Sequence, residues 1–166
     1  MAQHAIGSNL VPSFLRYNQK RDFGKLLTLN DRAMDSSPIG PTWKKEWNSS
    51  YRSIRQRYIK KGKGDFLVLY IGDAMVGMGG LEMKDGKTAM FRRLRIDPGF
   101  RGRRLAELFD SVRELRAREL GYEYAELEIQ TINIPRQKLA QKMGYVAAGG
   151  RSDGYGHEFI VYRKKL

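Results

Sequence analysis

The spacing of apolar residues divides the chain into predicted helices and strands. Apolar positions three and four residues apart predict a helix over 21–34 and a second one carrying the stripe Trp43, Trp47, Tyr51, Ile54 and Tyr58. The same spacing predicts a third helix from Leu105, Leu108, Phe109, Val112 and Leu115, and a short fourth helix lies between Pro135 and Gly144. Apolar, β-prone runs predict strands over 14–17, 66–71, 75–83, 88–96, 124–131, 145–148 and 158–162.

The order of these elements predicts an α/β (α+β) fold. In the second half of the chain, strands alternate with helices, which implies at least one parallel pair of strands. The aromatic stripe over 43–58 has two interpretations: a core-facing stripe with a solvated basic back, or a basic face that meets an acidic partner. The glycine-rich segment 149–156 is expected to be a mobile loop between the last two strands.

Length and composition limit the kinds of site that the chain can carry. The 166 residues predict an irregular lead-in over 1–12 and a single domain over 13–166. The absence of cysteine excludes disulfides, thiolate catalysis and cysteine-ligated zinc, and two histidines argue against a histidine-rich metal site. No apolar run reaches the ~18 residues of a membrane span, and the start has no signal-peptide pattern. We therefore expect a cytoplasmic protein that binds no metal and no membrane.

The charge balance adds a class of partner. Lys and Arg total 31 and Asp and Glu total 18, so the formal net charge is +13. A basic surface concentrates polyanions such as nucleic acid, ribosomes, an acidic protein or a phosphorylated small molecule. The alternative is a soluble protein whose basic surface has no such role, and no nucleic-acid-binding motif is present.

The most informative segment for chemistry is 94–106, where a strand ends, a basic loop follows and a helix begins. A helix N-terminus presents N–H groups without intrahelical partners and the positive end of the helix dipole. Gly102 allows close approach of a ligand, and Arg101, Arg103 and Arg104 add positive charge. The spacing of glycines is neither that of a P-loop nor that of a dinucleotide fingerprint. The segment is interpreted as a phosphate or pyrophosphate cradle, or as a basic helix start that binds nothing.

This segment resembles the acetyl-CoA signature of the GNAT superfamily. Ile96-Asp97-Pro98 and Arg101-Gly102 through Ala106 match it, with Arg104 where the central glycine is expected. The segments 127–133 and 139–145 resemble the next strand with its Asn133 and the family's Leu-Tyr-Glu-Lys-Leu-Gly-Phe ending. The resemblance implies a mixed, mostly antiparallel twisted sheet of six to seven strands flanked by about four helices. It implies acetyl-CoA as cosubstrate, bound by Leu94, Arg95, Ile96, Arg101, Gly102, Arg103, Arg104, Leu105, Ala106 and Asn133, and a homodimer is a family-level expectation.

The same resemblance frames the catalytic candidates. The family's general-acid tyrosine is replaced here by Ala140, which cannot transfer a proton. A carboxylate can take the proton of the attacking amine, and Glu128 is the first candidate, with Glu82 the second. Without cysteine the expected mechanism is direct attack in a ternary complex. The family's strand distortion near 94–96 would offer a backbone N–H to the thioester carbonyl.

Two functions follow from these observations. The first is an acetyl-CoA-dependent N-acetyltransferase acting on a primary amine of a small molecule or peptide, for which the basic charge suits an acidic or phosphorylated acceptor. Segments 35–57 and 149–157 are expected to shape the acceptor site. The second is a catalytically inactive protein of the same fold that uses its basic surface on nucleic acid or an acidic protein. Ala140, Arg104 and the net charge favour the second function, whereas the retained Arg101, Gly102, Ala106, Asn133 and Gly144 favour the first.

Overall fold

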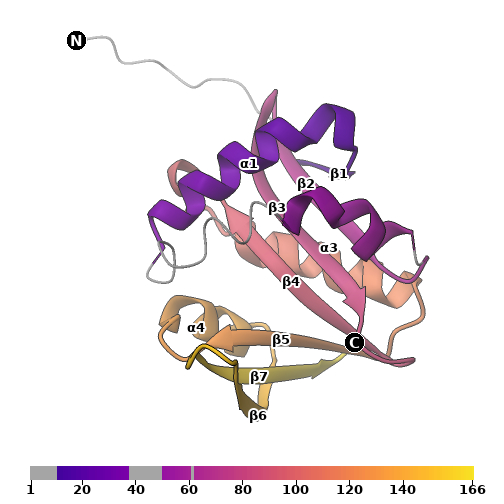
Figure 1. Cartoon of the computed structure of the whole chain (residues 1–166), viewed down its shortest axis with the longest axis vertical. Helices are drawn as coiled ribbons and strands as arrows, with labels where there is room; N and C mark the ends of the chain where they lie inside the picture. Colours follow the sequence, from indigo (N-terminus) through magenta and orange to yellow (C-terminus); the bar gives the residue numbers. More distant parts are fainter. Residues whose placement is uncertain (1–10, 38–49, 61) are drawn as a thin grey trace.

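We describe the protein from a computed structural model, which covers residues 11–37, 50–60 and 62–166. One seven-stranded sheet, in the order β1-β2-β3-β4-β5-β7-β6, forms its centre (Figure 1). The strands are β1 Ser13–Arg16, β2 Asp65–Ile71, β3 Ala74–Met83, β4 Thr88–Ile96, β5 Tyr124–Gln130, β6 Val146–Ser152 and β7 Glu158–Lys165. The α-helices are α1 Gln19–Asp35, α3 Leu105–Glu119 and α4 Ile134–Lys142, and shorter helical turns span Tyr51–Ser53, Arg55–Ile59 and Pro98–Phe100.

The sheet is mixed and mostly antiparallel, as predicted. β4 and β5 form the parallel pair, with α3 as the crossover between them, and every other neighbouring pair is antiparallel. β7 lies between β5 and β6, so the last strand in sequence is internal to the sheet. The prediction of a parallel pair in the second half of the chain is therefore confirmed.

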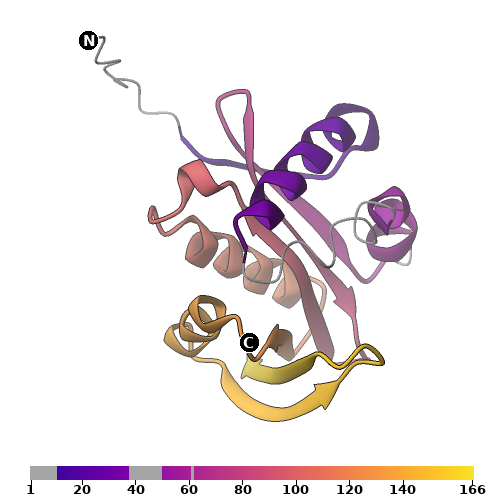
Figure 2. The same ribbon diagram turned by 60° about the vertical axis from the view of Figure 1, so that its left-hand side comes forward.

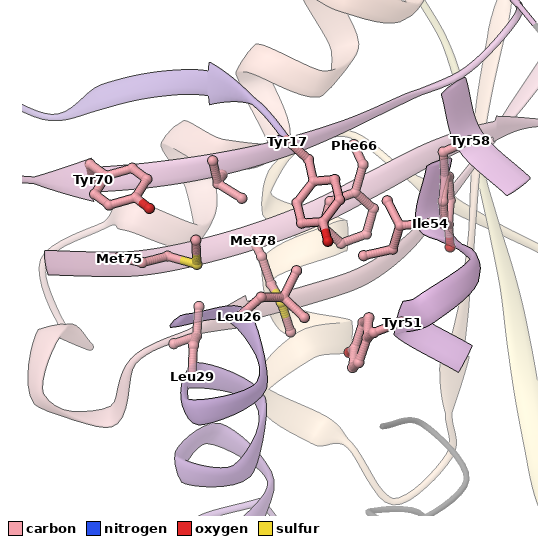
Figure 3. Packing of buried hydrophobic residues seen from close by; sticks show 11 residues of the cluster. Tyr17, Leu26, Leu29, Tyr51, Ile54, Tyr58, Phe66, Tyr70, Met75 and Met78 are labelled. Carbon is pink, nitrogen blue, oxygen red and sulfur yellow. The ribbon is translucent and has the colours of Figure 1, made fainter. Parts of the chain in front are cut away.

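One face of the sheet packs against α1 and the turns at 51–59. Side chains alternate along a strand, and Phe66, Val68 and Tyr70 of β2 point to this face. They contact Leu26 and Leu29 of α1 (Figure 3). The core cluster also takes in the second half of the predicted aromatic stripe, namely Tyr51, Ile54 and Tyr58, each about 1% exposed. The core interpretation is confirmed for these three residues, whereas Trp43 and Trp47 lie outside the described residues.

The opposite face packs against α3 and α4, and Figure 2 shows α1 and α3 on opposite sides of the sheet. Leu67 and Leu69 of β2 contact Leu105 and Phe109 of α3 in one cluster. The predicted apolar stripe of this helix is wrong in part, because Leu108 and Leu115 are exposed. The buried face of α3 instead carries three charged residues, Asp110, Arg113 and Glu114. Ion pairs thus replace apolar contacts on a helix face that sequence periodicity would assign to leucine.

The end of the chain also differs from the prediction. β6 extends to Ser152, so Gly149 and Gly150, predicted as part of a mobile loop, pair with Val161 and Ile160 of β7. A glycine lacks a side chain to pack but keeps both ladder groups, so the strand forms in spite of its composition. Of the predicted lead-in only residues 11 and 12 are described, and they lie outside β1. Among the described helices, none is both long and apolar enough to cross a bilayer.

A glycine-to-alanine pair tests the tight packing between β3 and the 51–59 turns. A Cβ on Gly80 would lie 2.6 Å from Tyr58 Cε1 and 2.9 Å from Phe66 Cδ2, whereas a Cβ on Gly86 would meet nothing within 4 Å. Because the rings of this core are closely packed, we expect Gly80→Ala to lower the free energy of unfolding by about 1–3 kcal/mol. Gly86→Ala is the control and should change it by less than about 0.5 kcal/mol. Urea unfolding gives both values, and equal midpoints would contradict the packing described.

Candidate functional site

The site lies where β4 and β5 separate. The two strands pair over only four residue pairs, from Thr88 opposite Tyr124 to Phe91 opposite Leu127. They converge near the C-terminus of the chain and diverge toward α4 (Figure 1). Beyond Phe91 and Leu127, the facing edges of both strands are therefore available to line a cleft within the sheet.

A β-bulge in β4 accompanies this separation. Gly80 is opposite Arg92 and Met78 is opposite Arg95, so two residues of β4 oppose Gly79 alone. Arg93, inside the bulge, has a φ of 59°, in the left-handed region that non-glycine residues rarely adopt. A bulge bends its strand and leaves the extra residue out of the ladder. The distortion that the family resemblance implied near 94–96 is thus present, centred one to two residues earlier.

Two adjoining pockets occupy the opening. The larger has a volume of about 580 Å³ and is lined by the loop after β4, the start of α3, and α4. The smaller has a volume of about 320 Å³ and is lined by β4, β5 and neighbouring arginines. Leu94, Arg95, Asn133 and Arg136 line both pockets. A molecule in one pocket can therefore meet a molecule in the other at these four residues.

The larger pocket is built on the basic loop 101–106. Gly102 has a φ of 76°, and Arg104, the N-cap of α3, has a φ of 59° and a side chain that makes no capping hydrogen bond. The first-turn amides of α3 therefore keep their donor capacity on the pocket side. The Arg104 side chain instead bonds Glu107, with its NH2 2.7 Å from Oε1. Arg101 donates to the carbonyl of Ala33 in α1 at 3.3 Å.

Most of the predicted cosubstrate-binding residues lie around this larger pocket. The lining includes Leu94, Arg95, Ile96, Arg101, Gly102, Arg104, Leu105, Ala106 and Asn133. Arg103 is not part of the lining. Its guanidinium lies 5.1 Å from the centroid of the Phe100 ring. Asn133 accepts a hydrogen bond from the Arg136 amide at 3.3 Å and so begins α4 at the edge of both pockets.

The smaller pocket is bordered by a chain of ion pairs on the α1 side of the sheet. Arg57 donates from Nε and NH2 to the two carboxylate oxygens of Glu82 at 2.7 and 2.8 Å. Arg92 bonds both Glu82, at 2.5 Å, and Glu128, at 3.2 Å. Arg151 of β6 donates to Glu128 Oε2 at 2.8 Å. Three arginines and two carboxylates thus form one network across four strands.

This network fixes the protonation state of both glutamates. Burial would raise the pKa of Glu128, but the hydrogen bond from Arg151 and the charge of Arg92 outweigh it and hold the pKa below its ordinary value of 4.5. The pKa of Glu82 is lowered in the same way, against burial, by Arg57 and Arg92. Both carboxylates are therefore ionised at neutral pH and able to accept a proton or hydrogen bond.

The predicted catalytic residues fall into different places. Glu128 lines the smaller pocket, whereas Glu82 does not and is linked to it through Arg57 and Arg92. Ala140 is fully buried in the core cluster with Leu127 and Ile129. Tyr145 is 2% exposed in the same cluster, and burial strongly raises the pKa of its phenol. The phenol does not line either pocket, so it is placed as a core aromatic.

Sequence reasoning missed the buried ion cluster beneath the site. Arg136 of α4 has its NH1 2.6 Å from Oδ2 of the fully buried Asp110. Arg113 ion-pairs with the same carboxylate and donates to the carbonyls of Gly80 and Arg92, the pair of residues next to the bulge, at 3.1 and 3.2 Å. The signal available was the charged trio at positions 110, 113 and 114 of a helix expected to be amphipathic.

A family comparison places the site in a known context. Residues 26–145 match the model of the acetyltransferase (GNAT) family. The matched range contains the bulge, the loop 101–106, Glu128 and the start of α4. A comparison with curated proteins gives no match.

Solved structures share the fold at low sequence identity. An acetyltransferase from Streptococcus agalactiae is 18% identical, with a TM-score of 0.80 over 93% of this chain and 98% of that chain. The PaiA N-acetyltransferase from Thermoplasma acidophilum, solved in complex with coenzyme A, is 14% identical, with a TM-score of 0.73 over 94% and 99%. A GNAT family acetyltransferase from Elizabethkingia anophelis, solved with acetyl-CoA bound, is 12% identical, with a TM-score of 0.70 over 96% and 100%. The predicted fold class is confirmed.

Replacing Asp110 tests the buried cluster. Asp110→Asn removes the charge that compensates Arg113 and Arg136, and we expect it to lower the free energy of unfolding by about 3–5 kcal/mol at neutral pH. Burial raises the pKa of Asp110, but Arg136 and Arg113 lower it further, so the net direction is down. The stabilisation is therefore present above the unfolded pKa of about 4 and is lost as the pH falls through the folded pKa. Denaturant unfolding at several pH values measures this difference.

The control for this variant is Glu123→Gln, which removes a carboxylate that is half exposed and paired only at the surface with Lys87. It should leave the unfolding midpoint essentially unchanged. A wild-type and an Asp110→Asn protein of equal stability at neutral pH would show that the cluster does not hold α3 and α4 together.

Proposed function

Because the chain belongs to the acetyltransferase (GNAT) family, we propose that it transfers an acetyl group from acetyl-CoA to a primary amine by direct attack in a ternary complex. The observation that carries the proposal is the pair of adjoining pockets that share Leu94, Arg95, Asn133 and Arg136. Direct transfer requires both substrates to be bound together with their reacting atoms about 3–3.5 Å apart. Two pockets that share these four residues support the proposal, because they allow two molecules to lie side by side.

The residues of the larger pocket fit acetyl-CoA, which members of the family use. Gly102 has open space where a Cβ would lie, and the first-turn amides of α3 offer the donors that a pyrophosphate accepts. Arg101 and Arg104 add positive charge at the same loop. We assign the pyrophosphate to the loop 101–106 and the remainder of the molecule to Leu94, Arg95, Ile96 and Asn133. Acetyl-CoA would supply a thioester whose carbon–sulfur bond breaks, with a thiolate leaving, as the carbon–nitrogen bond forms.

Glu128 is assigned as the proton acceptor for the attacking amine. Its carboxylate is ionised at neutral pH and lines the smaller pocket, so it can hold the proton that the amine loses. A lowered pKa makes it a weak base, which favours transfer of the proton late in the reaction or through water. Glu82 is the second candidate, and its support is weaker since Arg57 and Arg92 hold both of its oxygens.

Two further groups stabilise negative charge where the pockets meet. The residue out of the ladder at the β4 bulge leaves a backbone N–H for the developing oxyanion. Arg136 lines both pockets, and a cation at their junction would lower the pKa of a thiol bound there. A thiolate held in this way needs no tyrosine at position 140, so Ala140 does not preclude catalysis.

A second function, acetyl-CoA binding without turnover, is favoured by Ala140 and by the occupation of Glu128 by two arginines. The two functions differ in one measurable property. The catalytic protein releases free thiol from acetyl-CoA in the presence of an amine, and the binding protein does not. Because the chain has no cysteine, a thiol reagent reports only the product.

The cosubstrate pocket is tested by calorimetric titration of acetyl-CoA into two arginine variants. Arg101→Ala should weaken binding about 10- to 100-fold, the value of one to two charge-assisted hydrogen bonds. Arg118→Ala is the matched control, because Arg118 lies on α3, is 47% exposed and lines neither pocket. We expect its affinity to stay close to that of the wild type. Absence of binding to the folded wild-type protein would overturn the proposal.

The base is tested by thiol release with the amine that reacts fastest in a screen. Glu128→Gln should lower kcat/KM about 10²- to 10⁴-fold, with acetyl-CoA affinity retained, because only proton acceptance is lost. Glu82→Gln should lower it much less. A larger loss in the Glu82 variant than in the Glu128 variant would move the role of base to Glu82.

A further inference from the structure

The chemistry of the smaller pocket constrains the amine that can enter it. Seven arginines and only two carboxylates, Glu128 and Asp153, belong to its lining among the described residues. Asp153 is occupied by the ring of His157 at 2.9 Å and by the amides of Tyr155 and His157. Glu128 is therefore the acidic group that an entering ammonium would meet.

Five of these arginines outnumber the carboxylates to which they bond. Five of the seven, Arg57, Arg92, Arg113, Arg136 and Arg151, bond to three carboxylates, Glu82, Glu128 and Asp110. Even with Asp153 counted as a fourth carboxylate, these five arginines carry one positive charge more than the carboxylates. An amine without an anionic group would enter as a further cation, and like charges at an interface cost several kcal/mol.

The Arg151–Glu128 pair is the one that a ligand can exchange. Arg151 reaches Glu128 through a single hydrogen bond at 2.8 Å, and its side chain is 42% exposed and lies over the ring of Phe159. A half-exposed ion pair of this kind contributes about 0–1 kcal/mol, so breaking it costs little. Arg57 and Arg92, in contrast, share Glu82 through three hydrogen bonds.

We infer that the acceptor is an amine that also carries a carboxylate or phosphate group, an inference that rests on the proposed N-acetyltransferase function. The ammonium of such a molecule replaces Arg151 at Glu128, where its proton can be taken. The anionic group accepts hydrogen bonds from the released guanidinium, whose planar fork matches carboxylate and phosphate oxygens. Arg151 exchanges one anionic partner for another, and Glu128 exchanges one cationic partner for another. An amine with one carboxylate therefore adds no net charge to the pocket, and a phosphorylated amine lowers its positive charge. A polycation or an amine without an anionic group leaves Arg151 without this compensation.

Two matched pairs of amines test the inference by calorimetric titration into the protein saturated with CoA. O-phosphoethanolamine and ethanolamine differ by a phosphate, and 4-aminobutyrate and butylamine differ by a carboxylate. We expect at least one anionic member to bind in the KM range typical of enzymes, about 1 μM to 1 mM, and about 10-fold or more tighter than its partner. The pair with the larger difference identifies the anionic group that the pocket prefers.

Arg151→Gln gives the signature that a structural defect would not give. It should weaken binding of the anionic amine about 10- to 100-fold while leaving binding of its partner without the anionic group equal or stronger, because Glu128 is freed. Arg118→Gln, an exposed arginine on α3 that lines neither pocket, is the control and should change neither affinity.

The outcomes separate this inference from the proposed function. Equal binding of both members of each pair, tighter binding of the amines without an anion, or no binding of either anionic amine overturns the inference. The proposed function is overturned by different results, namely no binding of acetyl-CoA or no thiol release with any amine.

Discussion

The bulge in β4 is the constraint on which the site depends. Two residues of β4 oppose Gly79 alone, and Arg113 holds the distorted segment from below by donating to the carbonyls of Gly80 and Arg92. Gly79 permits this, since a Cβ there would lie 3.0 Å from Phe109 and 3.3 Å from the Arg113 guanidinium. Because the bent strand leaves β5 after Phe91, the sheet opens where a cosubstrate and an acceptor can meet.

Charge is used in two ways around this opening. Below the sheet, the fully buried Asp110 pairs with both Arg113 and Arg136, and the cluster ties α3, α4 and the bulge together. Above it, Arg57, Arg92 and Arg151 surround Glu82 and Glu128 in a partly solvated network whose outer pair is weak. The first arrangement is structural and fixed. The second leaves positive charge that an anionic group of a ligand, as inferred above, would compensate.

Sequence patterns predicted most strands and α1 because apolar residues mark one face of each, and they placed Arg101, Gly102 and Ala106 at a helix start by chemistry and resemblance together. They failed where ion pairs or backbone hydrogen bonds, and not apolar side chains, stabilise an element. Leu108 and Leu115 suggested the wrong face of α3, since the buried face pairs Asp110 with arginines. Gly149 and Gly150 suggested a loop, although ladder hydrogen bonds need no side chain. Arg136 was overlooked because a charged residue is expected at the surface.

The position of β7 within the sheet sets the order in which the strands can pair during synthesis. β7 pairs with every residue of β5 from Tyr124 to Gln130, so the strand that carries Glu128 has its full set of neighbours only when residues 158–165 are in place. During synthesis these residues leave the ribosome after every other strand of the sheet. The N-terminal half can form its local hairpins early. In contrast, β5, which forms the second side of the opening, gains its pairing with β7 last. A ribosome-bound chain lacking β7 would thus contain the loop 101–106 but not the finished β5 wall of the smaller pocket.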